Sequence, residues 1–231
     1  ANKFWPPFQT EFGFGPCYVN SRLTARGIPV ACEVDIYGAL SEFIGTCITG
    51  ESVTLLDINN TVPADMYAAS IAGKFPYRHD ETFMGFHCGN TPICRLKKGT
   101  MKYQLIMNRG LENGGEPDIT RGTLEGDIIP GGITFFRLQG NKDSVLTSYV
   151  AQGEVLPVDT QSFGGIGVFA IPEMTRFSRH VLIAGGYPHH GAVAFGHVGK
   201  AIFSTLKLLG VNTVSFNQPK GMLYPTENPF A

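Results

Sequence analysis

The sequence has little charge and almost no net charge. Only 16% of its 231 residues are Asp, Glu, Lys or Arg, and 18 Lys and Arg offset 19 Asp and Glu. In ordinary globular proteins about a quarter of all residues are charged. A charge near zero provides no field to hold nucleic acid or an anionic membrane, so we exclude both as partners. The low charged fraction also predicts a covered surface, in a homo-oligomer or against a separate N-terminal half.

The sequence also lacks long hydrophobic runs and paired cysteines. No 18 apolar residues run together, and no basic segment followed by an apolar one opens the chain. The five cysteines are dispersed without a Cys-x-x-Cys pair, which argues against a disulfide framework and against structural zinc. We therefore predict a cytoplasmic protein. The chain has no initiator methionine, and we expect a further segment upstream.

Two segments near the N-terminus predict a helix followed by a buried strand. Apolar residues from Glu33 to Ile48 recur at helical spacing, and Gly50 is a suitable stop. Residues 52–58, SVTLLDI, form a nearly continuous apolar run that is typical of a buried parallel strand. Helix followed by strand indicates the end of an α/β, Rossmann-like domain.

The rest of the chain predicts mainly antiparallel β-structure. Short β-rich runs separated by Gly-rich turns extend from about Thr82 to Pro172 and indicate an antiparallel sheet or small barrel. Residues 179–184, RHVLIA, predict a strand, residues 198–209 a helix that ends at Gly210, and residues 211–216 a last strand.

The predicted fold is therefore α/β followed by a barrel-like, mainly antiparallel β-domain with few helices. We place residues 1–75 in the α/β part and residues 76–231 in the β-part. The first carries two candidate carboxylates, and the second carries a candidate histidine ligand.

The two carboxylates are Glu33 and Asp57. The helix is about 24 Å long and the strand about 23 Å, and the short connection makes them antiparallel. Glu33 then lies at the same edge as Asp57, where two carboxylates favour a cation between them. Alternatively, Glu33 only complements the helix N-terminus, and Asp57 caps a turn. Asp35 is a weaker candidate because it points to another side of the helix.

Histidines supply the other candidates. His189 and His190 follow a predicted strand in GGYPHHG, and because neighbouring side chains diverge we expect one metal ligand and one supporting or substrate-facing partner. The alternative is a hydrogen-bonded loop histidine. His87, in MGFHCGN, is a similar but weaker candidate.

Several segments together resemble a known family. They are GIPVACEVDIYGAL at 27–40, LDINN at 56–60, HCGN at 87–90, PHH at 188–190 and GHV at 196–198. In this order they resemble the C-terminal half of the L-fucose isomerase and L-arabinose isomerase superfamily, and the fucose isomerase branch more closely. The resemblance runs from about Trp5 to Val214. The family's proteins are longer, with an α/β N-terminal region that this chain does not contain, and their active sites lie at subunit boundaries.

The resemblance implies a set of site residues. Glu33 and Asp57 would be metal ligands and the acid/base pair, and His190 would be the third ligand. His87 matches a further histidine ligand of the arabinose isomerase branch, so it would either ligate the metal or support the site. Further supporting or substrate-facing candidates are His189, Asn59 and Asn60.

The implied activity is interconversion of an aldose and a ketose through a cis-enediol. Oxygen and nitrogen ligands suit Mn²⁺, or another divalent cation such as Mg²⁺ or Co²⁺, and no organic cofactor is needed. We expect a neutral monosaccharide of the L-fucose, D-arabinose or L-arabinose type as substrate. Two alternatives remain: a non-catalytic fragment that binds sugar or metal or supports an oligomer, and a metal hydrolase that uses a bound hydroxide.

Overall fold

The computed structural model describes residues 8, 11–102, 122–160, 164–228 and 230. Its helices are α2 (Cys17–Thr24), α3 (Ile36–Thr49), α4 (Ala64–Ser70), α5 (Met174–Phe177), which continues into a π-helical segment (Ser178–Ile183), and α6 (Gly199–Leu208). Short 3-10 turns cover Cys32–Val34, His79–Glu81, Ile93–Arg95 and Pro225–Glu227. Among the described residues, no helix is long and apolar enough to cross a membrane.

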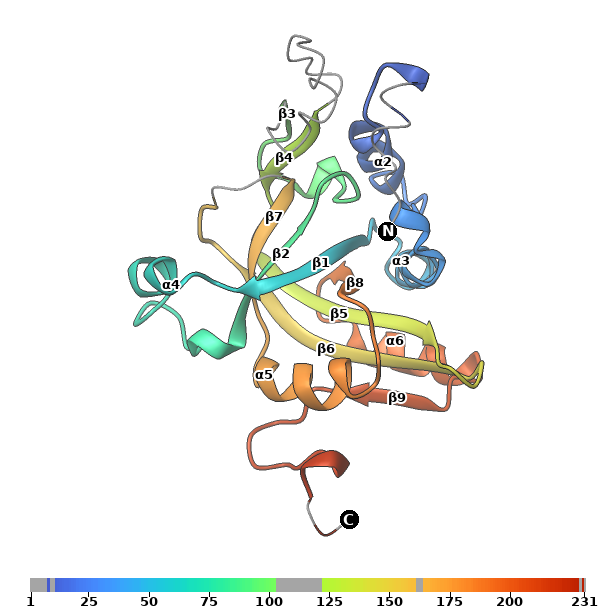
Figure 1. The fold of residues 1–231 in the computed structure, drawn as a ribbon, viewed down its shortest axis with the longest axis vertical. Coiled ribbons are helices and arrows are strands. Elements are labelled where there is room, and N and C mark those ends of the chain that lie inside the picture. The colour runs from blue at the N-terminus through green and yellow to red at the C-terminus, as the bar shows by residue number, and fades with distance from the viewer. Residues whose placement is uncertain (1–7, 9–10, 103–121, 161–163, 229, 231) are drawn as a thin grey trace.

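Nine strands form one large mixed sheet, which dominates the fold (Figure 1). The strands are β1 (Thr54–Thr61), β2 (Thr82–His87), β3 (Thr100–Lys102), β4 (Thr123–Asp127), β5 (Gly131–Gly140), β6 (Leu146–Leu156), β7 (Gly165–Ala170), β8 (His190–Phe195) and β9 (Thr213–Phe216). Their order is β3-β4-β7-β2-β1-β8-β5-β6-β9. A further pairing of β6 with β7 makes the sheet curl back on itself and joins β7-β2-β1-β8-β5-β6 into a ring. Among the described residues β3 and β9 extend beyond this ring as edges, so the nine-stranded sheet as a whole is not a closed barrel.

The predicted sheet-rich fold with few helices is confirmed, and most of the pairing is antiparallel. Strand β1 is the exception to our prediction, because it pairs antiparallel with both β2 and β8 and is not a parallel strand. Its apolar run reflects burial on both faces, which either direction of pairing can produce. Strand β1 lies between elements from the other side of the predicted boundary at residue 75. The division into two domains stays a prediction.

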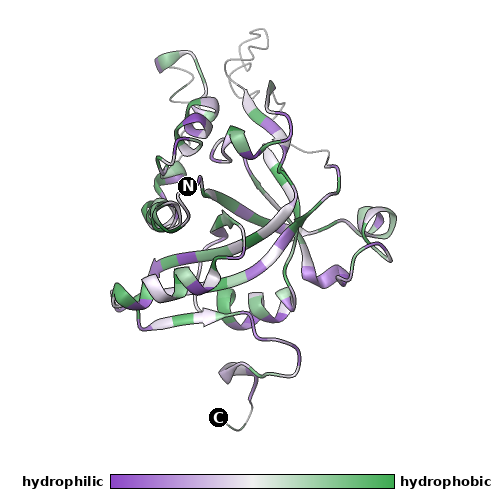
Figure 2. Ribbon diagram, turned by 180° about the vertical axis from the view of Figure 1, so that it is seen from behind, coloured by the Kyte–Doolittle hydropathy of each residue, from purple (hydrophilic) through white to green (hydrophobic). Residues whose placement is uncertain are grey.

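Apolar residues fill the inside of the curled sheet and its outer layer. The inner cluster includes the fully buried rings of Phe135, Tyr149 and Phe177. A second cluster joins α3 and α6 to the sheet, for example through Ile44 and Ile202. Figure 2 shows hydrophobic residues along the strands at the middle of the sheet. The core therefore fixes β1 and β8, the strands that carry the candidate site.

Two predicted helices are present, and one predicted strand is wrong. Helix α3 ends at Gly50, whose φ of 69° is the left-handed cap conformation that glycine adopts easily. Helix α6 and strand β9 also occupy their predicted positions. The segment RHVLIA, however, is helical. Its side chains of Val181 and Leu182 are buried together with Phe177, one helical turn earlier, so the apolar run covers the core as a helix does.

Candidate metal and sugar site

The candidate site lies where β2, β1 and β8 are neighbours in the sheet. His190 is the first residue of β8 and pairs with Asp57 on β1. On the other side of β1, Asp57 pairs with Phe86, which precedes His87 at the end of β2. The register of the sheet therefore brings together side chains from distant parts of the sequence. A ring nitrogen of His87, a carboxylate oxygen of Asp57 and a ring nitrogen of His190 all lie within 4.8 Å of one another.

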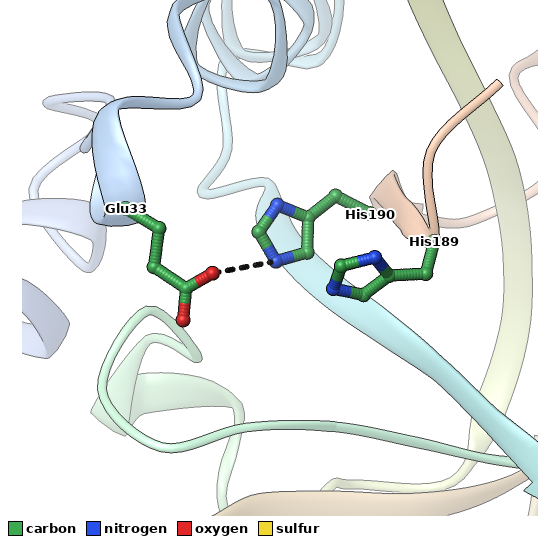
Figure 3. A group of neighbouring side chains, drawn as sticks. All are labelled: Glu33, His189 and His190. Atoms are coloured by element: carbon green, nitrogen blue, oxygen red, sulfur yellow. Dashed lines mark ion pairs between the residues drawn. The ribbon is translucent and has the colours of Figure 1, made fainter. Parts of the chain in front are cut away.

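The Nε2 atom of His190 has two carboxylates near it. It lies 3.0 Å from Oδ1 of Asp57. It also lies 3.8 Å from Oε2 of Glu33, and Figure 3 shows this second contact as a dashed line. Neither contact has hydrogen-bond geometry, and no other residue in the described part of the chain gives this buried nitrogen a partner. A buried imidazole nitrogen beside two carboxylates is a donor set that Mn²⁺ or Mg²⁺ accepts. The residues present therefore fit a divalent cation.

Glu33 reaches the site from a strained turn. It lies in the 3-10 turn before α3, with φ 58° and ψ 23°, and Val34 follows with φ 61°. Two successive non-glycine residues in the left-handed region are uncommon, and each costs roughly 1–3 kcal/mol. Helix α3 thus begins at Ile36, later than our prediction of a start at Glu33. The helix begins there because Asp35 is its N-cap.

Asp35 holds the far side of the His190 ring. Its Oδ1 accepts the Gly38 amide at 2.9 Å, and its Oδ2 lies 2.9 Å from Nδ1 of His190. Our expectation that Asp35 points away from the site is wrong. That argument placed it inside the helix, whereas a capping residue has non-helical backbone angles and a side chain turned back toward the helix.

Arg137 on β5 fixes Asp35 in turn. Its guanidinium donates two hydrogen bonds of 2.7 Å to the Asp35 carboxylate and a third, of 3.1 Å, to the carbonyl of His190. The Arg137 side chain is only 3% exposed. Sequence reasoning missed this residue, although one arginine inside the apolar run ITFFRL was a usable signal.

These contacts decide the charges at the site. Burial opposes a charge on His190, but the hydrogen bond to Asp35 and the adjacent carboxylate of Asp57 outweigh it and raise the pKa of His190 to about 9. Burial would raise the pKa of Asp57, but the His190 ring outweighs burial and lowers it. For Asp35, hydrogen bonds from His190, Arg137 and Gly38 overcome burial and lower the pKa. The second ring proton of His190, on Nε2, balances the carboxylates, and a bound cation would replace this proton.

The remaining candidates are placed differently. His189 is 63% exposed, and its Nε2 lies 2.9 Å from Oδ1 of Asp57. His87 is buried, and burial lowers its pKa to about 4. Asn59 lies on β1 and is exposed, whereas the side chain of Asn60 lies outside the described part of the structure. The structure therefore brings Glu33, Asp57, His190, His189 and His87 together.

The site lies at the surface of the described chain. The Glu33 side chain is 47% exposed, whereas His190 beneath it is 5% exposed. A sugar could approach the cation ligands from this open side.

Comparison with known proteins gives one family and several relatives. Residues 85–217 match the L-fucose isomerase, C-terminal domain family. A sulfoquinovose isomerase of Clostridium sp. (strain MSTE9) is 28% identical over 213 residues, which are 90% of this chain and 42% of the relative. Sulfoquinovose isomerases of Alkalicoccus urumqiensis and Priestia aryabhattai are 26% and 25% identical, over 93% and 92% of this chain and 43% of each relative. The chain thus spans less than half the length of these relatives.

Proposed function

Because this chain belongs to the L-fucose isomerase C-terminal domain family, we propose that it carries the metal site and the acid/base groups of an aldose–ketose isomerase. The observation that carries the proposal is the orphaned Nε2 of His190 beside the carboxylates of Asp57 and Glu33. The relatives named as sulfoquinovose isomerases support the same reaction class. The family resemblance stated from the sequence is confirmed.

Glu33, Asp57 and His190 would hold the cation, which we propose to be Mn²⁺ or a similar divalent ion. When bound, the cation would polarise the carbonyl and the adjacent hydroxyl of the open-chain sugar and so acidify the hydrogen on C2. Asp35 and Arg137 keep the His190 proton on Nδ1, which leaves Nε2 free as a ligand. His189 orients Asp57 by its contact with Oδ1.

The two carboxylates then move protons. One of them, Glu33 or Asp57, accepts the C2 proton, which leaves the cis-enediol as its anion, with the negative charge on the oxygen on C1. The other carries the hydroxyl proton from the oxygen on C2 to the oxygen on C1. The proton first removed is delivered to C1, which completes the ketose. No electron leaves the substrate, so no redox cofactor is required.

We propose that the complete protein is needed for turnover, because the site is open on one side and the chain covers 42% of a relative. By itself the described domain would bind the cation without enclosing the sugar. A cytoplasmic location belongs to the same proposal, and the five free thiols support it. The identity of the sugar is a question for experiment, and the sugars to test as substrates are L-fucose, D-arabinose, L-arabinose and sulfoquinovose.

The test compares three substitutions in the complete protein. His190→Ala removes a neutral ligand but keeps both acid/base groups, so Mn²⁺ affinity should fall and excess Mn²⁺ should restore part of the ketose formation. Asp57→Asn and Glu33→Gln should lose about 10² to 10⁴ in rate, and added metal should not restore them. Asp65→Asn, on the exposed start of α4, is the matched control and should resemble wild type.

Several results would overturn the proposal. Recovery of either carboxylate variant at saturating Mn²⁺ would make these side chains ligands only. Hydrolysis of esters without ketose formation would indicate the metal hydrolase. Tight Mn²⁺ binding by a complete protein that forms no ketose from any sugar would indicate a non-catalytic relative.

A further inference from the structure

His87 is held in one tautomer by the loop that follows it. Its Nδ1 accepts hydrogen bonds from two backbone amides, those of Gly89 at 3.3 Å and Asn90 at 3.1 Å. A nitrogen that accepts hydrogen bonds carries no proton of its own. The proton of the His87 ring therefore lies on Nε2.

The loop that presents these amides is itself fixed. Thr24 on α2 donates to the side-chain oxygen of Asn90 at 2.8 Å, and Ser21 donates to the carbonyl of Thr91 at 2.7 Å. A Cβ on Gly89 would lie 2.6 Å from the α2 backbone, so the loop is packed as closely as glycine allows. The two amides cannot easily turn away from His87.

The Nε2–H group of His87 faces the site without an acceptor. His87 is 1% exposed, and no described residue forms a hydrogen bond with Nε2. The ring centroids of His87 and His190 are 5.7 Å apart. An unsatisfied buried donor costs about 1–3 kcal/mol, which a bound acceptor would recover.

His190 has the opposite arrangement. Its Nδ1 faces the Asp35 carboxylate and keeps a proton, so Nε2 can offer a lone pair to a cation. His87 offers an N–H group to the same region. For Nε2 of His87 to ligate a metal, the ring proton would have to move to Nδ1, where the amides of Gly89 and Asn90 already donate. The structure therefore does not fit His87 as a fourth ligand, the role suggested by the arabinose isomerase branch.

We infer that His87 contacts the substrate, an inference that rests on the proposed function. Its Nε2–H donates to the carbonyl or hydroxyl oxygen at C1 or C2 of the bound aldose. Negative charge grows on these oxygens as the enediol forms, and a fixed donor in a buried position stabilises such charge. His87 would thus act on the transition state without exchanging a proton.

The tautomer can be tested in the metal-free chain. Nitrogen-15 NMR of the histidine-labelled protein should show one buried ring with its proton on Nε2, and His87→Gln should remove that signal. A proton on Nδ1 of His87, or on both nitrogens, would overturn the inference. The tautomer is read from the wild-type chain, with His87→Gln used only to assign the signal, and the measurement does not depend on whether the protein is active.

Metal coordination gives a second test. Pulsed EPR of the Mn²⁺ complex should detect one imidazole nitrogen, which disappears in His190→Ala and remains in His87→Leu. Two imidazole nitrogens, one of them lost in His87→Leu, would make His87 a ligand and overturn only the inference. No specific Mn²⁺ binding by wild type would overturn the proposed function, and the NMR experiment would still report the tautomer.

The contribution to catalysis is measured in the complete protein. His87→Leu should lower kcat by about 10² to 10³, the usual effect of removing one fixed donor, while Mn²⁺ affinity stays within about threefold of wild type. His87→Gln keeps an N–H donor near the same place and should recover part of the loss. Equal kcat in both variants, close to wild type, would contradict the role of the donor.

Discussion

The guanidinium of Arg137 donates to both carboxylate oxygens of Asp35, at 2.7 Å each, although the two residues are 102 positions apart. The same guanidinium donates to the carbonyl of His190, whose ring contacts Asp35. One buried arginine thus holds the histidine by its backbone and, through Asp35, by its ring. The stability of the fold and the geometry of the site depend on the same ion pair.

We expect Arg137→Met to lower the free energy of unfolding by about 3–5 kcal/mol. Removing one partner of a buried ion pair leaves the other charge without compensation. Urea denaturation of the metal-free chain measures the effect. Lys97→Met is the control, because the Lys97–Asp159 pair is 3.6 Å long and its side chains are 40% and 93% exposed, and it should change stability by about 1 kcal/mol or less. Equal losses in both variants would show that the buried pair has no special role.

We expect Asp35→Asn to weaken Mn²⁺ binding roughly 10- to 100-fold. The amide keeps the size of the side chain but removes the charge that holds the proton on Nδ1 of His190. Titration calorimetry with Mn²⁺ measures the affinity. Asp80→Asn, whose side chain is 49% exposed, removes one surface carboxylate of the same type and should leave the affinity unchanged. Unchanged affinity in Asp35→Asn would separate this carboxylate from metal binding.

Glu42 makes stability depend on pH. Burial raises its pKa well above the usual value, and one of its carboxylate oxygens has no hydrogen-bond partner among the described residues. The folded state therefore binds this proton more tightly than the unfolded chain, and the contribution of Glu42 to stability falls as the pH rises above about 4.5. Glu42→Gln should raise the free energy of unfolding at pH 8 by about 1 kcal/mol or more and have less effect at pH 4. Thermal unfolding at the two pH values measures this, and parallel pH profiles for the two proteins would contradict it.

Gly191 has no room for a side chain. A Cβ at this position would overlap the ring of Phe135 and lie 2.8 Å from the Tyr149 hydroxyl. We expect Gly191→Ala to destabilise the fold by about 1–3 kcal/mol and to displace His190, the preceding residue. Gly199→Ala is the control, because the three atoms nearest to its Cβ would all belong to the flexible side chain of Gln152. Circular dichroism melts and Mn²⁺ titration would detect both effects, and equal melting of the two variants would contradict the steric argument.

The sequence predicted element types well where local signals were strong. Periodicity predicted helix α3, with its cap at Gly50, and helix α6. The turn residues predicted the mainly antiparallel strands after residue 82. The six-residue run RHVLIA was too short to assign as helix or strand, because a short apolar run suits a strand and a buried helix equally. Its helical state depends on packing against the core, which is not a local property.

The sequence pattern also did not reveal which face of α3 is buried. Ile36, Leu40 and Phe43 mark a stripe that amphipathic reasoning turns toward the core, yet their exposed fractions are 68%, 39% and 52%. The buried face carries small and polar residues such as Gly45 and Glu42. Which face is buried depends on the neighbouring elements. The predicted homo-oligomer, or pairing with a separate N-terminal half, stays a prediction.

For the site, the sequence supplied the residues and the structure supplied their arrangement. Glu33, Asp57 and His190 were named from motif positions. The sheet brings Asp57 to Nε2 of His190, and the turn before α3 brings Glu33 to the same nitrogen. Asp35 and Arg137 could not be assigned, because their roles depend on a capping geometry and on contacts between elements that are far apart in sequence. The tautomer of His87 likewise depends on backbone amides that a sequence pattern does not reveal.

The left-handed backbone at Glu33 and Val34 has an evolutionary consequence. Selection for thermostability alone would favour glycine or asparagine at both positions, because these residues adopt positive φ at lower cost. At Val34 such a change would relieve strain without removing a carboxylate, so stability and activity would be selected together. At Glu33 the same change would remove a proposed metal ligand, so the two pressures would oppose each other. Among thermophilic relatives, variation is therefore expected at position 34 before position 33.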